Sequence, residues 1–150
     1  MYKRQTSPIG PLRFAASGRG VTRVCFEGEP LLDDALSVSP LVTQELTEYF
    51  AGTRREFTVP LDLSGVTEFR AAVLRELAKV PFGETTTYAQ LARAVGNPKA
   101  VRAVGSACAT NPLPLFIPCH RVLRSDGQLG GYRGGVEAKR FLLRMEGIDV

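Results

Sequence analysis

A cysteine, the chain's only histidine and an arginine stand side by side as Cys119, His120 and Arg121. Apolar residues flank the three on both sides, which predicts a largely buried segment, and Pro118 fixes the backbone just before the thiol. An imidazole, positive charge and hydrogen bonds beside a cysteine lower the pKa of its thiol, so this pattern could produce a thiolate nucleophile. An isolated Cys-His pair is nevertheless more often a small core residue beside a satisfied, buried histidine. The rest of the chain has to decide between the two interpretations.

Composition and charge narrow the class of protein. The 150 residues suffice for one compact unit or two small ones, and 44% hydrophobic with 23% charged residues is ordinary for globular proteins. No apolar run is long enough to span a bilayer and no signal peptide follows the N-terminus, so we expect a cytoplasmic protein without a membrane partner. Residues 1–65 carry 7 Lys/Arg and 8 Asp/Glu, whereas residues 66–150 carry 12 and 7. The basic second half suits a polyanionic partner, although charge alone fits a well-solvated surface equally.

The three cysteines, Cys25, Cys108 and Cys119, show no metal-binding or redox spacing such as C-x-x-C. An odd number in a reducing compartment predicts free thiols. A zinc site built from these cysteines with His120 would lack the ligand pairs that such sites use. We therefore expect no metal and no other cofactor, and no resolving thiol arranged beside Cys119.

The first half, residues 1–65, is expected to be a scaffold domain without chemistry of its own. Residues 12–16 and 21–26 predict two strands, and residues 17–20 between them predict a hairpin turn. Cys25, in the second strand, is expected in the core.

Further along this half, residues 27–39 predict an acidic loop. Pro40 is suited to the first position of an amphipathic helix that ends at Gly52. Residues 57–59 predict a third strand, and residues 60–65 predict a linker to the second half.

The second half, residues 66–150, predicts a mostly helical domain. A helix is expected over residues 67–79, and a capping box at residues 87–90 opens a short helix that Gly96 ends. Asn97 and Pro98 predict the N-cap and first residue of another helix that runs to Ala109. Residues 130–135 predict a glycine-rich loop, and residues 136–146 predict the last helix. Two helices joined by a tight turn are typical of a helix-turn-helix.

The second helix of this pair has two distinct faces. Three residues are predicted to be buried on one face: Val101, Val104 and Cys108. Another face carries three alanines with basic or polar residues beside them: Ala100, Ala103, Ala107, Lys99, Arg102 and Ser106. An exposed face of small residues could approach a phosphate backbone or groove floor closely. Packing of the alanines against another helix is equally compatible with the periodicity.

The segment Pro118-Cys119-His120-Arg121 resembles the active-site signature of the O6-alkylguanine-DNA alkyltransferases, also called methylated-DNA–protein-cysteine methyltransferases. Five further motifs follow this family in order and spacing: Tyr88–Ala92, Gly96–Gly105, Asn111–Pro114, Gly130–Gly135 and Phe141–Gly147. The resemblance covers about residues 66–147 and extends more loosely to residues 7–12 and 48–52. It implies an α/β fold, in which a small N-terminal α+β domain (ribonuclease H-like, residues 1–65) precedes a mostly helical alkyltransferase domain (residues 66–150) with a helix-turn-helix and a buried active-site cysteine.

The resemblance also implies DNA repair by direct, stoichiometric transfer of an alkyl group. The sulfur of Cys119 would attack the alkyl carbon on O6 of a flipped-out guanine in double-stranded DNA, with O4 of thymine as a further candidate. The product is a thioether, which offers no easy hydrolysis, so each molecule would act once. The protein would act as a monomer that approaches the minor groove, and Arg102 would fill the space left by the extruded nucleotide.

Roles for other residues follow from the same resemblance. His120 would act as a base through a water, Glu146 would hold its tautomer, and Tyr88 would donate its hydroxyl to the guanine. Asn111 would tie the recognition helix to the active-site loop. From the residues alone, Glu146 is a surface residue, Tyr88 packs the first helix, and Arg102 contacts phosphate.

The base pocket is expected to form from five residues: Tyr88, Cys119, Val122, Tyr132 and Arg133. Backbone groups of Cys119, Val122 and Arg133 would read the guanine edge, and the glycine-rich loop would close over the base.

Three departures from the family pattern and three rival functions accompany this interpretation. Glu68 stands where many members have proline, Cys108 where a larger apolar residue is usual, and Arg133 where some members have a small residue; the last two leave the preference between methyl and bulkier groups open.

A non-catalytic lesion-recognition module would lack the cysteine that this chain has. A Cys-His hydrolase would take its histidine from elsewhere in the fold, and a helix-turn-helix regulator would present more base-reading side chains.

Overall fold

The computed structural model describes residues 3–30 and 38–150, whose contacts divide into two compact units, Met1–Gly65 and Val66–Val150. Most of the predicted acidic loop, residues 31–37, lies outside the described residues. Among the helices of the described ranges, none has the length and apolar character needed to cross a membrane.

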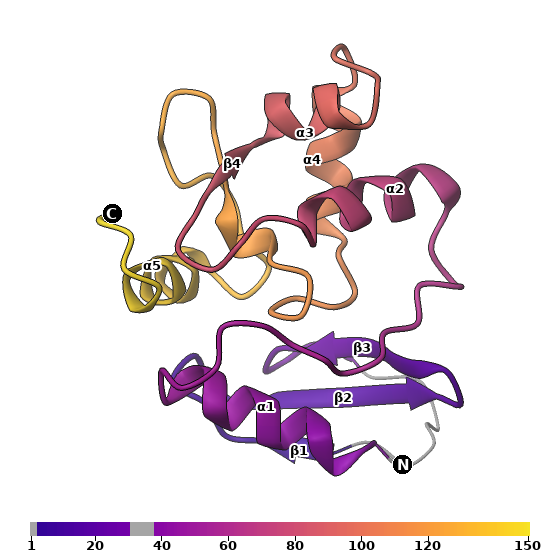
Figure 1. Ribbon diagram of the computed structural model, residues 1–150, viewed down its shortest axis with the longest axis vertical. Coiled ribbons are helices and arrows are strands. Elements are labelled where there is room, and N and C mark those ends of the chain that lie inside the picture. The colour runs from indigo at the N-terminus through magenta and orange to yellow at the C-terminus, as the bar shows by residue number, and fades with distance from the viewer. Residues whose placement is uncertain (1–2, 31–37) are drawn as a thin grey trace. The chain divides into compact units, whose positions relative to one another are not determined.

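A three-stranded antiparallel sheet forms the first unit's framework (Figure 1), with the order β1 (Lys3–Gln5), β2 (Leu12–Ser17) and β3 (Gly20–Cys25). The predicted hairpin is confirmed, since Ser17 pairs with Gly20 across a two-residue turn. Position 20 requires glycine because its φ is +151° and a Cβ there would overlap the carbonyl of Pro60.

The predicted helix of the first unit is also confirmed, as α1 (Pro40–Phe50). The Ser39 hydroxyl accepts from the Leu41 N–H at 3.2 Å, and proline fills the first helical position. Its apolar stripe of Val42, Leu46 and Tyr49 is buried, and α1 runs alongside the sheet in Figure 1. On the strand side, Leu12 and Phe14 are fully buried core residues, so the core lies between helix and sheet.

The strand predicted for residues 57–59 is wrong. The backbone N–H groups of Thr58 and Val59 donate to the buried carboxylate of Glu45 at 2.8 and 3.1 Å instead of to a neighbouring strand. A single bridge between Val21 and Leu61 is the only strand-like pairing of this segment among the described residues. A side chain has therefore taken the donors that a strand would need.

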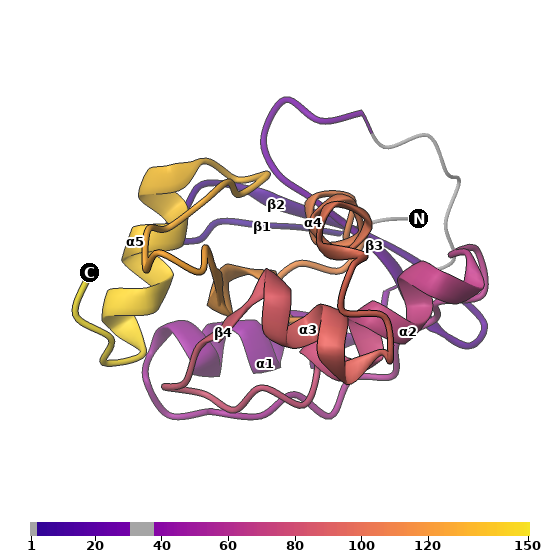
Figure 2. The same ribbon diagram turned by 90° about the horizontal axis from the view of Figure 1, so that it is seen from above.

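The second unit is built from four α-helices with short pieces of other structure between them (Figures 1 and 2). The helices are α2 (Glu68–Leu77), α3 (Tyr88–Ala94), α4 (Val101–Ala109) and α5 (Val136–Met145). The first three pack against one another, whereas α5 packs against the 3₁₀ turn η1 (Cys119–Arg121). Two short strands that the sequence pattern did not predict, β4 (Thr86–Thr87) and β5 (Val122–Leu123), pair in parallel directly before α3 and directly after η1.

The helix-turn-helix prediction is confirmed for α3 and corrected for the start of α4. Thr87 and Gln90 form the predicted capping box. Asn97 does not cap α4, because the Ala100 N–H donates to the Asn97 carbonyl at 3.0 Å and closes a turn before the helix. Consequently α4 begins at Val101, and Ala100 is its N-cap without a side-chain hydrogen bond.

The predicted faces of α4 are partly wrong. Val101 is 38% exposed, while Ala107 is buried at 1% together with Val104 and Cys108. Since α4 packs on both α2 and α3, a small residue at position 107 lets the helices approach closely, and Val101 at the first position extends past that contact. Helix packing therefore explains Ala107, and only Ala103 and Ala100 of the three alanines keep exposed surface.

Candidate active site

The segment that holds the cysteine and histidine is buried throughout residues 113–122, as the apolar flanks predict. Asn111, 1% exposed, organises its first turn: the Asn111 amide donates to the Ile117 carbonyl and its oxygen accepts from the Leu113 N–H, each at 2.9 Å. Within the same segment Leu115 has a φ of +77°, and it is the only such non-glycine among the described residues. Backbone strain of this kind persists only where the surrounding packing imposes it, so the approach to Cys119 is rigid.

Glu146 lies at the end of α5 and joins the histidine to the arginine of the motif. Its carboxylate is 2.7 Å from His120 Nε2 and accepts a two-pronged pair of bonds from Arg121, at 2.8 and 2.9 Å. Arg121 also donates to the Val80 carbonyl at 2.7 Å, and the Gly83 N–H donates to Glu146 at 3.3 Å. Because Nε2 faces a carboxylate, it carries the ring proton, and Nδ1 is the basic nitrogen.

The pKa of the Cys119 thiol is raised, not lowered as the sequence pattern predicts. Burial is the largest cause; the Asn111 side chain and the charges of Arg133 and Lys139 oppose it. Burial also lowers the pKa of His120, against the attraction of Glu146. The resting site therefore holds a protonated thiol beside a neutral imidazole that can accept a proton.

Lys139 on α5 is a site residue that sequence reasoning missed. It is fully buried, and its ammonium donates to three backbone carbonyls: Val122 at 2.6 Å, Gly131 at 3.2 Å, and Leu129. Burial lowers its pKa to about 8, against the influence of nearby cysteines. The available signal was a charged residue three positions before Leu142 on the apolar stripe of an amphipathic helix.

A cavity of about 430 Å³ gathers most of the predicted base pocket. It is lined by Tyr88, Gly105, Cys108, Ala109, Cys119, Gly131, Tyr132 and Arg133. Val122, predicted to contribute, does not line it: the residue is fully buried and its carbonyl accepts from Lys139. Neighbouring Gly130, with a φ of +72°, lies so close to the Tyr88 hydroxyl that a Cβ would come within 3.3 Å of it. The glycine-rich loop thus forms one wall directly against Tyr88.

Cys108 in the last turn of α4 shares this cavity with Cys119, so a second thiol lines the pocket although the sequence predicts no resolving thiol beside Cys119. The two cysteines stand eleven positions apart in the chain, and only the return of the loop through Asn111 brings them to one cavity. All three cysteines are free thiols.

The remaining predicted residues lie on the outer face of α4 and in the turn directly before it. Lys99, Arg102, Ala103 and Ser106 are exposed, and Ala100 is half-buried. Arg70 of α2, which the sequence pattern did not single out, donates to the Ser106 hydroxyl at 3.4 Å. The face therefore presents small side chains between three positive charges.

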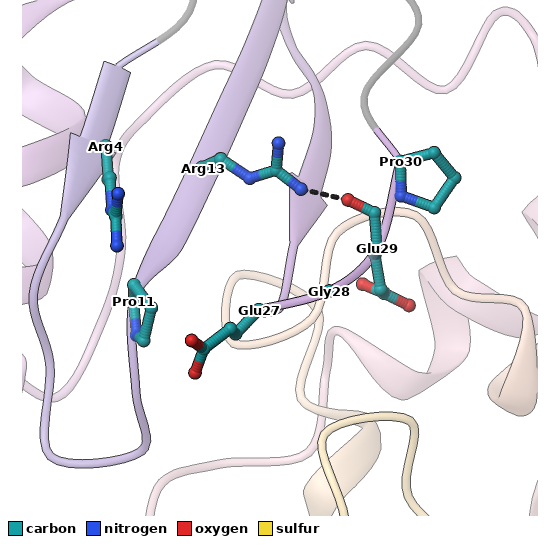
Figure 3. Close-up of a pocket in the computed structure, with 7 residues that line it drawn as sticks. All are labelled: Arg4, Pro11, Arg13, Glu27, Gly28, Glu29 and Pro30. Atoms are coloured by element: carbon teal, nitrogen blue, oxygen red, sulfur yellow. Dashed lines mark hydrogen bonds between the residues drawn. The ribbon is translucent and has the colours of Figure 1, made fainter.

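Another cavity, of about 520 Å³, lies in the first unit and has different chemistry (Figure 3). It is lined by Arg4, Pro11, Arg13, Glu27, Gly28, Glu29 and Pro30. Arg13 donates to the Glu29 carbonyl. No thiol or imidazole stands among the lining residues, and the described residues contain no cluster of three metal-ligating side chains in either unit.

Comparison with known proteins places both halves of the chain. The family described as "6-O-methylguanine DNA methyltransferase, DNA binding domain" matches residues 68–148, and its "ribonuclease-like domain" matches residues 1–63. The constitutive methylated-DNA–protein-cysteine methyltransferase of Bacillus subtilis (strain 168) is 40% identical over 159 residues, covering 99% of this chain and 96% of that protein.

Solved structures agree with the sequence matches. The crystal structure of Mycobacterium tuberculosis OGT in complex with DNA superposes with a TM-score of 0.90 at 39% identity, over 97% of this chain and 91% of that one. S. pombe Atl1, in complex with damaged DNA containing O6-carboxymethylguanine, matches 55% of this chain and 78% of its own at 31% identity, with a TM-score of 0.51. The chain therefore belongs to the 6-O-methylguanine DNA methyltransferase family.

Proposed function

We propose that this protein repairs DNA by transferring an alkyl group, typically methyl, from O6 of guanine to its own Cys119, which is consumed in a single turnover. It is a methylated-DNA–[protein]-cysteine S-methyltransferase that needs no cofactor and acts as a monomer in the cytoplasm on double-stranded DNA. The observation that carries the proposal is the position of Cys119: it lines a cavity of about 430 Å³ and is followed directly in the chain by His120, which pairs with Glu146. A family whose relatives are named for this reaction supplies the substrate.

The proton leaves the thiol when the lesion is in place. Burial raises the pKa of Cys119, so the thiol predominates over the thiolate in the free protein. His120 Nδ1 takes the proton, through a water, and Glu146 stabilises the imidazolium that forms. Lys139 and Arg133 add positive charge that favours the thiolate during this step.

Transfer is then a displacement at carbon. The sulfur of Cys119 bonds to the methyl carbon while the carbon–O6 bond breaks, and the electron pair of that bond stays on guanine. The Tyr88 hydroxyl donates a hydrogen bond to the charge that develops on the base. Burial, together with the nearby cysteines, raises the pKa of Tyr88 and keeps it a neutral donor. A proton equivalent to the one removed from Cys119 restores neutral guanine.

Asn111 and the glycine-rich loop hold the geometry of the pocket. Asn111 joins the end of α4 to the cysteine segment through the Ile117 carbonyl, and its own carbonyl accepts from Arg133. Tyr132 and Arg133 form the wall that closes over the base, with backbone groups of Cys119 and Arg133 at the guanine edge. Lys139 fixes the start of this loop by its bonds to the Leu129 and Gly131 carbonyls.

The outer face of α4 is the proposed DNA-binding surface. Small residues there, Ala100 and Ala103, permit a close approach to the minor groove, while Lys99 and Ser106 contact the backbone. Arg102 fills the stack after the damaged nucleotide turns out, a step that costs a few kcal/mol of unstacking.

The alternative is a module that recognises alkylation lesions without repairing them, and the similarity to S. pombe Atl1 is the observation that keeps it in consideration. That similarity covers only 55% of this chain. The presence of Cys119 in the cavity favours transfer.

Intact-protein mass spectrometry decides between the two. The protein is mixed with excess duplex carrying O6-methylguanine, and the product is mapped by peptide. Transfer predicts the gain of one methylene mass, confined to Cys119 and absent from the Cys119→Ala variant. Tight lesion binding by the unaltered protein with no change of mass would contradict transfer and support the recognition module.

A further inference from the structure

Two thiols share the reactive cavity, although methyl transfer uses one. Cys108 lines it from α4 and Cys119 from η1, and they are 6% and 8% exposed. Each thiol appears among the electrostatic neighbours of Tyr88 and of Lys139, so both sit within the same small group of polar atoms. The third cysteine, Cys25, is fully buried in the other unit, where its thiol contacts the Pro30 carbonyl at 3.7 Å.

Asn111 holds the backbones of the two cavity cysteines together. Its N–H donates to the Cys108 carbonyl at 3.3 Å, and its side-chain amide donates to the Ile117 carbonyl at 2.9 Å. The Cys119 N–H donates to that same Ile117 carbonyl at 2.8 Å. Hydrogen bonds of Asn111 thus connect the backbone at Cys108 to the backbone at Cys119.

The environments of the two thiols differ in a way that separates their chemistry. Burial raises the pKa of both thiols, but at Cys119 the Asn111 hydrogen bond and the positive charges of Arg133 and Lys139 oppose this effect and favour the thiolate. The pKa of Cys108 is raised to about 12, mainly by burial and also by Cys119, and only Lys139 opposes these effects. A peroxide oxidises thiolates in preference to thiols, so Cys119 is the thiol of this pair that reacts first.

We propose that Cys108 is a resolving thiol for Cys119, so that a peroxide converts the cavity pair into a reversible Cys108–Cys119 disulfide. In the first step Cys119 loses its proton, its thiolate attacks one peroxide oxygen and the O–O bond breaks. Cys119 becomes a sulfenic acid, and the other oxygen leaves with a proton equivalent to the one removed from the thiol, as water or an alcohol. In the second step the Cys108 sulfur displaces the hydroxyl from Cys119, and the Cys108 proton leaves with that hydroxyl as water. A cellular dithiol reverses the disulfide by exchange.

The consequence rests on the proposed function. A protein that can use its acceptor only once loses all activity if that acceptor is oxidised to sulfinic acid, which is irreversible for almost all proteins. Capture of the sulfenic acid by Cys108 stops oxidation at a recoverable stage. The disulfide also occupies the sulfur that would attack the lesion, so the oxidised protein is inactive until it is reduced. The thioether made by repair is not a substrate for this exchange, because it contains no sulfur–sulfur bond.

The reduced protein is treated with graded hydrogen peroxide and then unfolded in denaturant with an alkylating reagent, so that every remaining free thiol, buried Cys25 included, is blocked. Intact mass and peptides are measured without reduction. We expect the intact mass to equal that of the reduced protein less two hydrogens plus one reagent group on Cys25. Peptide mapping should give a Cys108–Cys119 linked peptide. Methyl transfer should be lost with disulfide formation and should return almost completely on treatment with a dithiol.

Three variants sharpen the test: Cys108→Ala, Cys108→Ser and the matched control Cys25→Ala. Each is compared with its own untreated activity, because Cys108 lines the pocket and its replacement can change the basal rate. Both position-108 variants should accumulate sulfinic acid at Cys119 and recover only a minor fraction of transfer after reduction, whereas Cys25→Ala should recover like the parent. Two position-108 variants guard against a folding defect in either.

The inference is overturned if peroxide gives sulfinic acid at Cys119 while Cys108 remains a free thiol, or if Cys108→Ala and Cys108→Ser recover as fully as the parent. Transfer by the untreated protein is measured in parallel. Disulfide formation in a protein that never methylates Cys119 would count against the proposed function alone, and normal transfer without the disulfide would count against Cys108 alone.

Discussion

Each unit of the molecule buries one glutamate and holds it with a neighbouring arginine. In the first unit Glu45 on α1 is fully buried and accepts from the Thr58 N–H, the Thr58 hydroxyl and the Val59 N–H, with Arg54 at 3.2 Å. In the second unit Glu146 at the end of α5 is 5% exposed and receives the paired bonds of Arg121. Both carboxylates connect segments that are far apart in the sequence.

The two carboxylates differ in the partner that each has besides its arginine. Glu45 faces a hydroxyl and backbone donors, whose protonation never changes, and these bonds lower its pKa although burial opposes them. Glu146 faces His120 at 2.7 Å, and an imidazole can gain or lose a proton in the physiological range. The same arrangement is thus structural in one unit and, in the mechanism proposed for the other, controls the base beside Cys119. Substitutions at the two glutamates should separate these uses.

The largest effect is expected from Glu146→Gln. The amide cannot stabilise the imidazolium, so single-turnover methyl transfer should slow by about 100-fold or more, the range found for losing general-base assistance. Rapid-quench measurement of Cys119 methylation against time gives the rate. A matched Glu45→Gln variant should transfer at the parental rate once folded. A folded Glu146→Gln protein with an unchanged rate would remove His120 and Glu146 from the mechanism.

Arg121→Met should have the next largest effect, mainly on stability. It leaves the buried Glu146 carboxylate with His120 and without its charged clamp, and breaking a buried pair costs about 3–5 kcal/mol. Chemical denaturation measures the loss. Since Arg121 is one of the charges that lower the pKa of His120, its removal should also shift the acidic limb of the transfer-rate profile to higher pH. A stability loss without that shift would mean that Arg121 acts on the fold only.

Glu45→Gln should destabilise the first unit by about 1–3 kcal/mol, the cost of leaving buried donors poorly satisfied. The glutamine oxygen can keep both backbone N–H donors, which share one carboxylate oxygen, but its NH₂ group then faces the Thr58 hydroxyl and the Arg54 guanidinium. Thermal unfolding, followed together with hydrogen exchange of residues 57–61, measures this. Protection that is lost equally in both units would show that Glu45 supports more than its own segment.

Sequence patterns predicted the parts of the fold whose signals are local. The hairpin at Ser17–Gly20, the helix opened by Pro40 and the capping box at Thr87 each depend on a few adjacent residues with one favoured conformation. The β4–β5 pair could not be predicted in this way, because two residues show no periodicity and their partners lie 36 positions apart. The missing strand at residues 57–59 has the same origin, since its backbone donors go to a side chain from another element.

The candidate site shows a similar boundary. The motif and the resemblance pointed to Cys119, His120 and Glu146. Cys119 and His120 are neighbours in the chain, and the structure brings Glu146 to His120. The resemblance also pointed to Cys108 as a residue that affects pocket width, and Cys108 does line the cavity. Lys139 was not revealed, because its contacts depend on how α5 returns to the cysteine segment. The direction of the Cys119 pKa was also mispredicted, because neighbouring residue types show the charges present but not the extent of burial that outweighs them.

Lowering the pH should destabilise the second unit before the first, and this is the smallest of the expected effects. Burial lowers the pKa of His120, so the imidazole of the unfolded chain is protonated at a higher pH than that of the folded protein. The contribution of His120 to the free energy of unfolding is therefore complete above the pKa of the unfolded chain, about 6.5, and declines as the pH falls through that value. In the first unit Glu45 has a lowered pKa and Asp62 titrates at about 2, so their contributions stay until the pH falls below about 4. Hydrogen exchange between pH 7.5 and 4.5 should therefore show protection declining first around η1 and α5, while β2 and α1 stay protected. His120→Gln, which binds no proton in this range, should abolish the early decline, and an equal decline in that variant would assign it to another group.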